Sequence, residues 1–569
     1  GSVQSLIRIN IKPSVTDNPE SVAKPMVATG ALHTIALKYD GTVWTWGNNT
    51  NGQLGNNSTE NSSSPVQVKS ADGNGYLTNI IEISAGSGHN MALSKDGTVF
   101  TWGSNTYGQL GNGSSVNSML PVQVKSADGN SFLTDIVQIS AGYVHSMALK
   151  KDGTVLAWGR NDGGQLGNNN TSNKSLPVQV KGGASGSEYL TDVVQVTAGN
   201  WHSMALKANG TVYAWGWGQY GQLGNGYTTN RNDTDYYSGE KIYSAPVQVL
   251  NGAQTSETGY LKEVVQIDAM GGTGHNDRNR FGTSLAVTES KEVYGWGNSL
   301  YGALGVNSSI VSTPVRVATG ISTAVQVAGG SKSGSDDYHV YSIGNTGYTY
   351  ILKEDGTVSS LGYNVNGELG NGANTSTTNV CTVQGLTNVA QIAGSKDGNF
   401  GAAVKKNGTI WTWGQNTYGQ LGNGTTDTPK TKPIQAGTEG SNTLVVHKIT
   451  IDSSIDNTTP MGNIGVYGDN NTFVSTVTLR GDDSSATKKF DAFSISSVDV
   501  SRKFNLNLAV DEEQYLKANE KLTYQSMNPE IVTVDASGNV RPAHKGKYGS
   551  TVILIQYNYN FCLLYTSDA

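Results

Sequence analysis

This sequence of 569 residues has little of what marks several common protein classes. Its two cysteines, Cys381 and Cys562, lie far apart, so a disulfide scaffold is not expected and Cys381 is interpreted as a small packed residue. No run of about 18 apolar residues exists, and we predict no membrane span. Charged residues make up 14% of the chain and the net charge is −6. This balance argues against nucleic acid as a partner, because nucleic-acid-binding proteins usually present a basic face.

Motifs that carry catalysis or bind cofactors are also missing. The sequence has no glycine-rich phosphate loop, no nucleophile elbow and no zinc-ligand spacing. No pair of carboxylates is singled out as an acid and a base. We therefore predict a non-enzyme without a cofactor or a metal. No signal peptide is visible and the chain starts at Gly1, so we interpret it as a mature product or a fragment.

Glycine, by contrast, is abundant: 72 of the 569 residues, against a usual share of about 7%. Many of the glycines recur within one repeated unit, whose clearest copy is residues 137–180, VQISAGYVHSMALKKDGTVLAWGRNDGGQLGNNNTSNKSLPVQV. In that copy, HSMALK and TVLAWG alternate in polarity on the two sides of Asp152 and Gly153. The pattern predicts a β-hairpin, for which we expect a two-residue type I′ turn.

Seven copies of the unit follow one another. The turn glycines are Gly41, Gly97, Gly153, Gly210, Gly356 and Gly408, with Lys291 in the remaining copy. Five positions later stand Trp46, Trp102, Trp158, Trp215, Trp296 and Trp413, with Leu361 in the sixth copy. Because Lys291 replaces the glycine, we expect that hairpin to use another geometry.

Each copy offers four strands, which we name a, b, c and d: the VVQVSAG-like segment, the two hairpin strands and a proline-led PVQV segment. Four-stranded units arranged radially are typical of a β-propeller. Seven units can close a ring, whereas a linear stack would expose two apolar end faces. We therefore predict an all-β fold: a seven-bladed β-propeller of four-stranded antiparallel blades, with the tryptophans packed between blades.

The phrase ALxxDGTVxxWGxNxxGQLGxG resembles the repeat of the regulator of chromosome condensation family, over about residues 26–437. The resemblance implies a seven-bladed propeller. It also implies an alternative function as a guanine nucleotide exchange factor-like regulator of a small GTPase, the role of the founding eukaryotic member. The same fold serves unrelated tasks elsewhere, so the resemblance bears more on the fold than on the function.

The regions outside the repeat suggest further domains. Residues 1–25 form an N-terminal strand and linker, either the end of a preceding domain or a strand that helps to close the ring. Residues 438–490 are interpreted as a strand-rich connecting region. Residues 491–560 resemble a bacterial immunoglobulin-like group 2 domain, a β-sandwich that looks truncated; the matching positions are Asn528-Pro529, Val534-Asp535, Gly538 and Gly546. Residues 561–569 fit no strand pattern and are interpreted as a non-native tail.

Histidines recur in register eight residues before the turn glycine: His33, His89, His145 and His202. The same position holds Thr283, Tyr348 and Phe400 in the last three copies. A position that accepts phenylalanine is a packing position, so we interpret these histidines as structural. Asp72 and Asp128 stand without the further oxygen ligands that calcium needs, and we interpret them as turn residues.

Insertions single out one face of the predicted disc. Residues 227–244 are inserted in the c–d loop of copy 4, and residues 271–280 and 331–346 in the a–b loops of copies 5 and 6. In an up-and-down blade these loops share a face, so the insertions emerge together from adjacent blades. We predict a ligand site there, with aromatic residues expected to be exposed beside polar ones; its candidate residues are Trp201, Trp217, Tyr236, Tyr237, Arg278, Arg280, Asp336 and Asp337. The opposite face, with long d–a links, is the alternative.

The favoured function is a non-catalytic binding module of a bacterial secreted or cell-surface protein. We expect it to recognise a protein or a glycan, as a monomeric propeller within a longer multidomain chain. The acidic balance, the Asn/Ser/Thr-rich loops and the immunoglobulin-like resemblance favour an extracellular setting. Besides the exchange factor, a glycan-active enzyme built on a propeller is the third hypothesis.

Overall fold

The computed structural model describes residues 23–183, 188–228, 242–254, 258–271, 280–332, 346–406 and 408–437, and elsewhere a set of strands. The chain forms two compact units. The first comprises residues 23–405 and 410–440, and the second comprises residues 1–22, 406–409 and 441–569. In the part of the chain that is described, no helix is long and apolar enough to cross a membrane.

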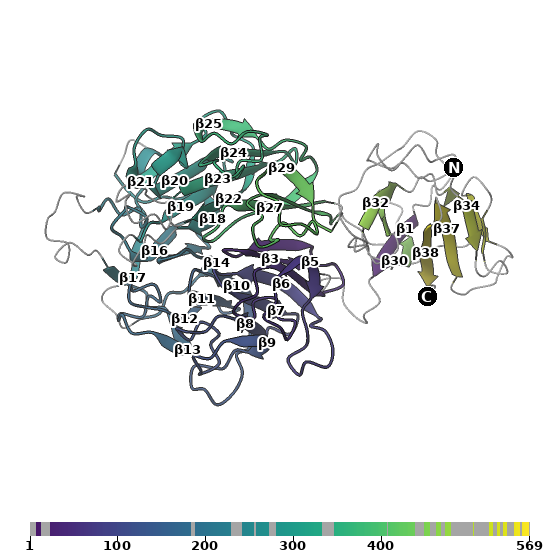
Figure 1. Cartoon of the computed structure of the whole chain (residues 1–569), viewed down its shortest axis with the longest axis horizontal. Helices are drawn as coiled ribbons and strands as arrows, with labels where there is room; N and C mark the ends of the chain where they lie inside the picture. The colour runs from purple at the N-terminus through teal and green to yellow at the C-terminus, as the bar shows by residue number, and fades with distance from the viewer. Residues whose placement is uncertain are drawn as a thin grey trace. The chain divides into compact units, whose positions relative to one another are not determined.

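The first unit is a β-propeller of seven four-stranded antiparallel sheets, each built from consecutive strands (Figure 1). This confirms the predicted propeller and its four-stranded blades. The a strands are β2 (Met26–Thr29), β6 (Ile80–Ala85), β10 (Ile136–Ala141), β14 (Val193–Ala198), β18 (Val264–Met270), β22 (Ala324–Lys332) and β26 (Val389–Gly394). The b strands are β3 (His33–Leu37), β7 (His89–Ser94), β11 (His145–Lys150), β15 (His202–Lys207), β19 (Thr283–Thr288), β23 (Thr346–Lys353) and β27 (Phe400–Lys405).

The outer half of each blade is formed by strands c and d. The c strands are β4 (Val43–Gly47), β8 (Val99–Gly103), β12 (Val155–Gly159), β16 (Val212–Trp217), β20 (Val293–Asn298), β24 (Val358–Gly362) and β28 (Ile410–Gly414). The d strands are β5 (Ser62–Gln67), β9 (Ser118–Gln123), β13 (Lys174–Gln179), β17 (Ile242–Gln248), β21 (Ile310–Val317), β25 (Thr377–Thr382) and β29 (Lys430–Gln435). Two short 3₁₀ helices, η2 (Gly252–Gln254) and η4 (Leu300–Gly302), lie in loops. Proline falls inside strand d rather than leading it, as at Pro65 in β5, which suits an edge strand because proline cannot donate to a ladder.

The b–c hairpins differ from the predicted type I′ turn. In blade 1, Gly41 N–H donates to the carbonyl of Lys38 (3.1 Å) and Lys38 N–H donates to that of Thr42 (3.0 Å). Gly41 has a φ of 75°, whereas Asp40 is not in the left-handed region. The loop is therefore a type I turn followed by a left-handed glycine in a bulge. Asp40 Oδ1 accepts the backbone N–H of Thr42 (3.0 Å), which accounts for the Asp before the glycine.

The hairpin of blade 5 uses the same geometry, so the expectation of another one is wrong. Lys291 adopts a φ of 60°, and its N–H donates to the carbonyl of Thr288 (2.8 Å). A lysine pays a conformational cost in this region that glycine does not. The hydrogen-bonded strands β19 and β20 on the two sides of the turn nevertheless hold Lys291 in this conformation.

Replacing Lys291 with Gly is expected to raise the free energy of unfolding by about 0.5–1 kcal/mol, because it relieves the left-handed strain. The exposed ion pair between Lys291 and Glu354 is lost, and such pairs contribute little. The matched reverse change, Gly153→Ala, places a side chain at a φ of 79° and is expected to lower that free energy by about 1–2 kcal/mol. Urea denaturation of the two variants measures both effects; equal destabilisation by both would contradict the prediction.

The repeated tryptophans lie between blades, as predicted: Trp46, Trp102, Trp158, Trp215, Trp296 and Trp413 are fully buried. Trp158 of blade 3 packs in a cluster with Met91 and Val124 of blade 2. Its Nε1–H donates to the carbonyl of Gln109 in the GQLG segment of blade 2 (2.9 Å). The glycine of that segment lies against the indole, since a Cβ on Gly111 would sit 2.7 Å from Trp158 Nε1. The indole therefore leaves no room for a side chain at Gly111, which explains the second glycine of the GQLG segment.

The repeated histidines form buried hydrogen bonds between neighbouring blades. Ser146 of blade 3 donates its hydroxyl to the carbonyl of Gln109 (2.8 Å), so it must accept the Nε2–H of His89 from blade 2 (3.0 Å). The same contact joins His145 to Ser203 (3.0 Å). Burial lowers the pKa of His89 and His145 to about 3. These histidines are neutral donors in the blade interfaces.

The ring closes without a shared strand. Trp46 of blade 1 donates its Nε1–H to the carbonyl of Gln420 of blade 7 (2.9 Å), which is the contact that the other repeated tryptophans make with their preceding blades. Val27 N–H donates to the side-chain oxygen of Gln391 (2.8 Å), and the Gln391 amide donates to the Val27 carbonyl (2.9 Å). Strand β1 (Ile7–Lys12) does not take part, because it pairs antiparallel with β30 (Ile449–Ile455).

The second unit contains a five-stranded sheet in the order β1-β30-β38-β37-β34, a hairpin and a three-stranded sheet in the order β33-β36-β35. Its strands are β31 (Asn463–Tyr467), β32 (Phe473–Thr478), β33 (Phe504–Asn505), β34 (Thr523–Ser526), β35 (Val532–Val534), β36 (Asn539–Pro542), β37 (Thr551–Tyr557) and β38 (Asn560–Ser567). Strand β38 covers residues for which the sequence predicted no strand, and it pairs with β37 and β30. The immunoglobulin-like sandwich stays a prediction.

Candidate functional site

The chain direction divides the loops of the propeller between two faces. The a–b and c–d loops share one face, which we call the upper face. The b–c turns and the d–a links share the other, the lower face. The three insertions fall between β16 and β17, between β18 and β19, and between β22 and β23, so all belong to upper-face loops.

A buried asparagine organises most of the c–d loops. In blade 2, Asn105 Oδ1 accepts the N–H of Leu110 (2.9 Å). Its Nδ2 donates to the carbonyls of Ser114 (3.1 Å) and Val116 (3.0 Å). The same role falls to Asn49, Asn161, Asn364 and Asn416. Gly218 stands at this position in blade 4, so the c–d loop that carries the insertion lacks the anchor.

Beside that loop, aromatic rings and guanidinium groups alternate in one stack. The Arg160 guanidinium lies 4.6 Å from the ring centroid of Tyr107 and 4.4 Å from that of Trp201. The Arg280 guanidinium lies 4.1 Å from the centroid of Trp201 and 4.5 Å from that of Trp217. The order is therefore Tyr107, Arg160, Trp201, Arg280 and Trp217. The stack draws on blades 2 to 5, and each cation faces aromatic rings that attract it.

One carboxylate joins the two arginines. Asp162 accepts two hydrogen bonds from Arg160, each of 2.9 Å, and a third of 2.9 Å from Arg280 Nη2. The Asp162 side chain keeps 40% of its surface exposed, against 8% for Arg160 and 13% for Arg280. Paired charges held in place by stacking resist rearrangement. The stack is thus a rigid support beneath the upper face.

The structure brings three of the predicted site residues together: Trp201, Trp217 and Arg280. It does not expose the tryptophans as expected, since Trp201 is 0% and Trp217 3% exposed. The reason is that guanidinium groups cover their ring faces. Tyr236, Tyr237, Arg278, Asp336 and Asp337 lie outside the described residues.

The sequence analysis missed Arg160, Asp162 and Tyr107. Arg160 is the one charged residue at a position where the other copies carry Asn48, Ser104, Trp217, Asn298, Tyr363 and Gln415, and this charge was the available signal. Partly exposed rings surround the stack on the upper face. Tyr143 approaches Trp201 (centroids 6.3 Å apart), and Tyr220 packs on Phe281 (4.4 Å).

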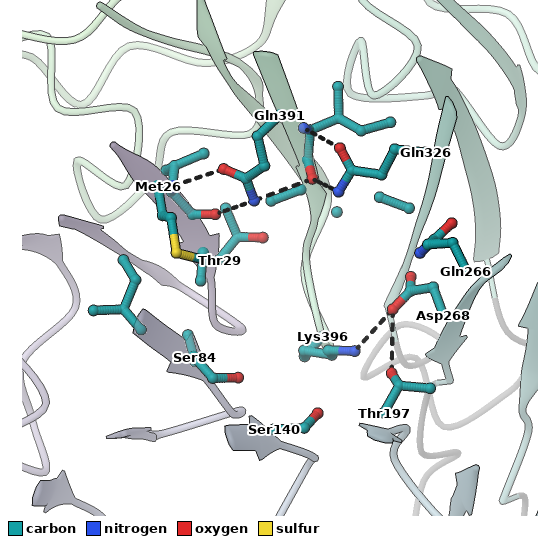
Figure 2. Close-up of a pocket in the computed structure, with 18 of the residues that line it drawn as sticks. Met26, Thr29, Ser84, Ser140, Thr197, Gln266, Asp268, Gln326, Gln391 and Lys396 are labelled. Atoms are coloured by element: carbon teal, nitrogen blue, oxygen red, sulfur yellow. Dashed lines mark hydrogen bonds and ion pairs between the residues drawn. The ribbon is translucent and has the colours of Figure 1, made fainter. Parts of the chain in front are cut away.

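The central channel is the second candidate (Figure 2). It encloses a cavity of about 180 Å³ lined by the seven a strands. Near its wall, a belt of glutamine side chains joins five of the seven blades to the next blade. For example, Gln195 accepts the N–H of Ile267 (2.9 Å) and donates to the carbonyl of the same residue (3.1 Å). The belt also includes Gln138, Gln266, Gln326 and Gln391.

The charged groups of the channel form hydrogen bonds and an ion pair with one another and with the backbone of its wall. Lys396 donates to the carbonyl of Ala269 (2.7 Å) and lies 3.7 Å from Asp268. Asp268 accepts the N–H of Gly329 (2.8 Å). Among the residues that are described, no group of three His, Cys, Asp or Glu side chains could hold a metal ion. The channel wall is therefore a structural network, and the upper face is the better candidate for binding.

Glu82 takes the belt position in blade 2, where it accepts the N–H of Ile139, and burial raises its pKa to about 8. Since the unfolded pKa is about 4.3, the folded state holds the proton more tightly, and stability falls as pH rises from about 4.5 to 8. Glu82→Gln is expected to add about 1–3 kcal/mol to the free energy of unfolding at pH 9 and little at pH 4.5. The matched change Gln138→Glu should do the opposite. Urea denaturation at the two pH values measures this; pH-independent effects would contradict it.

Comparison with known proteins agrees with this architecture. The family model for the RCC1-like domain matches residues 6–348 and 77–451. The ultraviolet-B receptor UVR8 of Arabidopsis thaliana is 28% identical over 414 residues, 72% of this chain and 80% of that protein. Human E3 ubiquitin-protein ligase HERC2 is 29% identical over 304 residues, which cover 53% of this chain and 5% of the ligase.

Among solved structures, yeast RCC1 (Prp20) bound to Kap60 superposes with a TM-score of 0.52 at 20% identity. The match covers 74% of this chain and 89% of that one, and at this identity it bears on the fold alone. The family model, in contrast, covers well over half of the chain and follows its repeats. The chain therefore belongs to the RCC1-like domain family.

Proposed function

We propose that this protein is a non-catalytic binding module whose propeller holds a protein partner on its upper face, above the stack formed by Tyr107, Arg160, Trp201, Arg280 and Trp217. The observation that carries the proposal is the stack itself. It holds side chains from blades 2 to 5 against one another without a partner, and a preorganised surface binds at a lower entropic cost. Among the residues that the structure describes, no comparable stack of rings and guanidinium groups joins the other upper-face loops.

The surface around the stack has the composition of a protein-binding site. Tyr143, Tyr220 and Phe281 present partly exposed rings, and Asp162 presents a partly exposed carboxylate. Aromatic anchors surrounded by fixed polar groups are typical of interface centres. A protein partner also has a precedent in the fold, because Kap60 is bound to yeast RCC1 (Prp20) in the structure named above. A glycan ligand at the same place is the alternative.

The experiment compares surface variants rather than stack variants, because the stack is buried. The full chain serves as bait for extracts of its native surroundings, and the binding constant of each captured protein is then measured by biolayer interferometry. Tyr143→Ala with Tyr220→Ala is expected to weaken binding by about tenfold or more. The matched control, Tyr76→Ala with Tyr189→Ala on the lower face, should leave it unchanged. Weaker binding by the lower-face variant, with unchanged binding by the upper-face variant, would contradict the proposal and indicate a site on the lower face.

We propose in addition that the protein works outside the cell or on a bacterial cell surface. The support is compositional: few charged residues, two cysteines and loops rich in Asn, Ser and Thr, with the immunoglobulin-like resemblance of residues 491–560. Protease treatment of intact cells tests this. Digestion of the propeller before a cytoplasmic marker is the expected result, and protection until lysis would contradict it.

A further inference from the structure

The exposed apolar residues of the propeller are concentrated on its lower face. Fifteen large apolar side chains are exposed in the described part of the chain. Eight of these belong to the d–a links or to the starts of the a strands that follow. They are Tyr76, Phe132, Val137, Tyr189, Val194, Tyr260, Val265 and Val325. The four aromatic residues among them recur in one register of the links, and exposed rings repeated in this way mark an interaction surface.

The four aromatic residues occupy the same position in four successive links. Tyr76, Phe132, Tyr189 and Tyr260 are 55%, 53%, 48% and 52% exposed. Each is followed by a buried leucine that fixes the link in a blade core: Leu77, Leu133, Leu190 and Leu261. Burial of the leucine turns the aromatic side chain outward, because neighbouring residues of an extended chain point to opposite sides.

The first two links are closed hairpins. Tyr76 is bridged to Lys69 and Phe132 to Lys125, and Tyr189 is likewise bridged to Lys181. In the first link, Asp72 accepts the N–H of Asn74 (3.1 Å), and the Ser70 hydroxyl accepts the N–H of Gly75 (2.9 Å). Tyr76 and Phe132 are therefore presented on closed turns.

The charge around the rings is nearly balanced, with Asp135 and Asp192 as additional acidic residues three positions after the second and third rings. Each of the first three links holds one lysine and one acidic residue: Lys69 with Asp72, Lys125 with Asp128 and Lys181 with Glu188. A polyanion or a basic partner gains little from such a surface. Exposed hydroxyls lie two residues beyond three of the rings, at Thr78, Thr134 and Thr191.

We propose that this arc of four aromatic residues binds an uncharged linear polysaccharide. The C–H faces of sugar rings pack on aromatic rings, and hydroxyl groups pair with Thr and Asn side chains. Four exposed rings in four successive links match a ligand that repeats along its length. The rings are not identical platforms, because the Lys181 ammonium lies 4.6 Å from the centroid of Tyr189 and covers one of its faces. The nearly balanced charge excludes a steering role for electrostatics. The site is independent of the proposed protein site, because it lies on the opposite face.

The test uses the full chain and named polymers: insoluble cellulose and chitin in pull-down, and soluble xylan and β-1,3-glucan in affinity gel electrophoresis. Wild type is expected to be retained by at least one of them. Each single ring-to-Ala change should weaken that binding about threefold to tenfold, and the quadruple change by more. The single variants keep the result interpretable should the quadruple variant fold poorly.

The matched control lies on the same face with similar exposure but no rings: Val137→Ala, Val194→Ala, Val265→Ala and Val325→Ala combined. This variant should bind the polysaccharide as wild type does. Retention by none of the polymers, or equal binding of the aromatic variants, would overturn the proposal. A protein ligand that is lost in both the aromatic and the valine variants would also overturn it, in favour of an apolar protein interface.

Discussion

Lowering the pH from 7.5 to 5 is expected to destabilise the propeller by several kcal/mol. Burial lowers the pKa of His33 to about 4 and that of His89, His145 and His202 to about 3. The unfolded pKa is about 6.5, so the unfolded state binds more protons throughout this range. The stabilising contribution is complete above pH 6.5 and is lost as pH falls towards 3. Linkage gives about 2 kcal/mol for each histidine at pH 5, or at most about 8 in total.

Urea denaturation at intervals of pH measures this loss. The Glu82→Gln background is used, because Glu82 titrates with the opposite sign. His145→Gln is the matched variant: its amide can donate to Ser203 as the imidazole does, but it does not titrate. Its stability should fall less between pH 7.5 and 5 than that of the parent. A parent curve that is flat over this interval would contradict the neutral, buried state of these side chains.

Trp158→Ala is expected to lower the free energy of unfolding by about 3–5 kcal/mol. The indole is fully buried between blades 2 and 3, so its removal leaves a cavity that the neighbouring sheets cannot collapse into. The carbonyl of Gln109 also loses the Nε1–H donor. Guanidinium denaturation with tryptophan fluorescence and circular dichroism measures the change.

Trp44→Ala is the control for this prediction. Trp44 lies in strand c of blade 1, two residues before the inter-blade Trp46. Its ring is partly exposed, and the Lys38 ammonium lies 4.1 Å from the ring centroid. Its loss should cost about 1 kcal/mol or less, as partial exposure and a surface cation–π contact imply. Equal destabilisation by the two changes would show that the inter-blade position has no special weight.

The sequence determined the architecture because its information is local and repeated. Alternation around Asp152-Gly153 predicts a hairpin wherever it occurs, and a tryptophan five residues beyond the turn predicts an apolar wedge. When the unit is repeated seven times in register, a closed ring is one of few arrangements that bury all the repeated tryptophans. The turn type was beyond this reasoning, because Asp-Gly suits both a type I′ turn and a type I turn with a glycine bulge. The hydrogen bonds of Lys38 and Gly41 with the ladder decide between them.

The candidate binding surface depends on contacts between residues that are distant in the sequence. Arg160 and Asp162 come from blade 3 and Arg280 from blade 5, and only the radial packing of blades 3 to 5 places these charges within hydrogen-bonding distance. The cations then cover Trp201 and Trp217, which is why side chains expected at the surface are buried. Glu82 shows the same dependence: its residue type suggests an anion, but its burial in the wall beside Ile139 favours the protonated form. Local patterns fix strands and turns, whereas exposure and protonation follow from what the fold packs around each group.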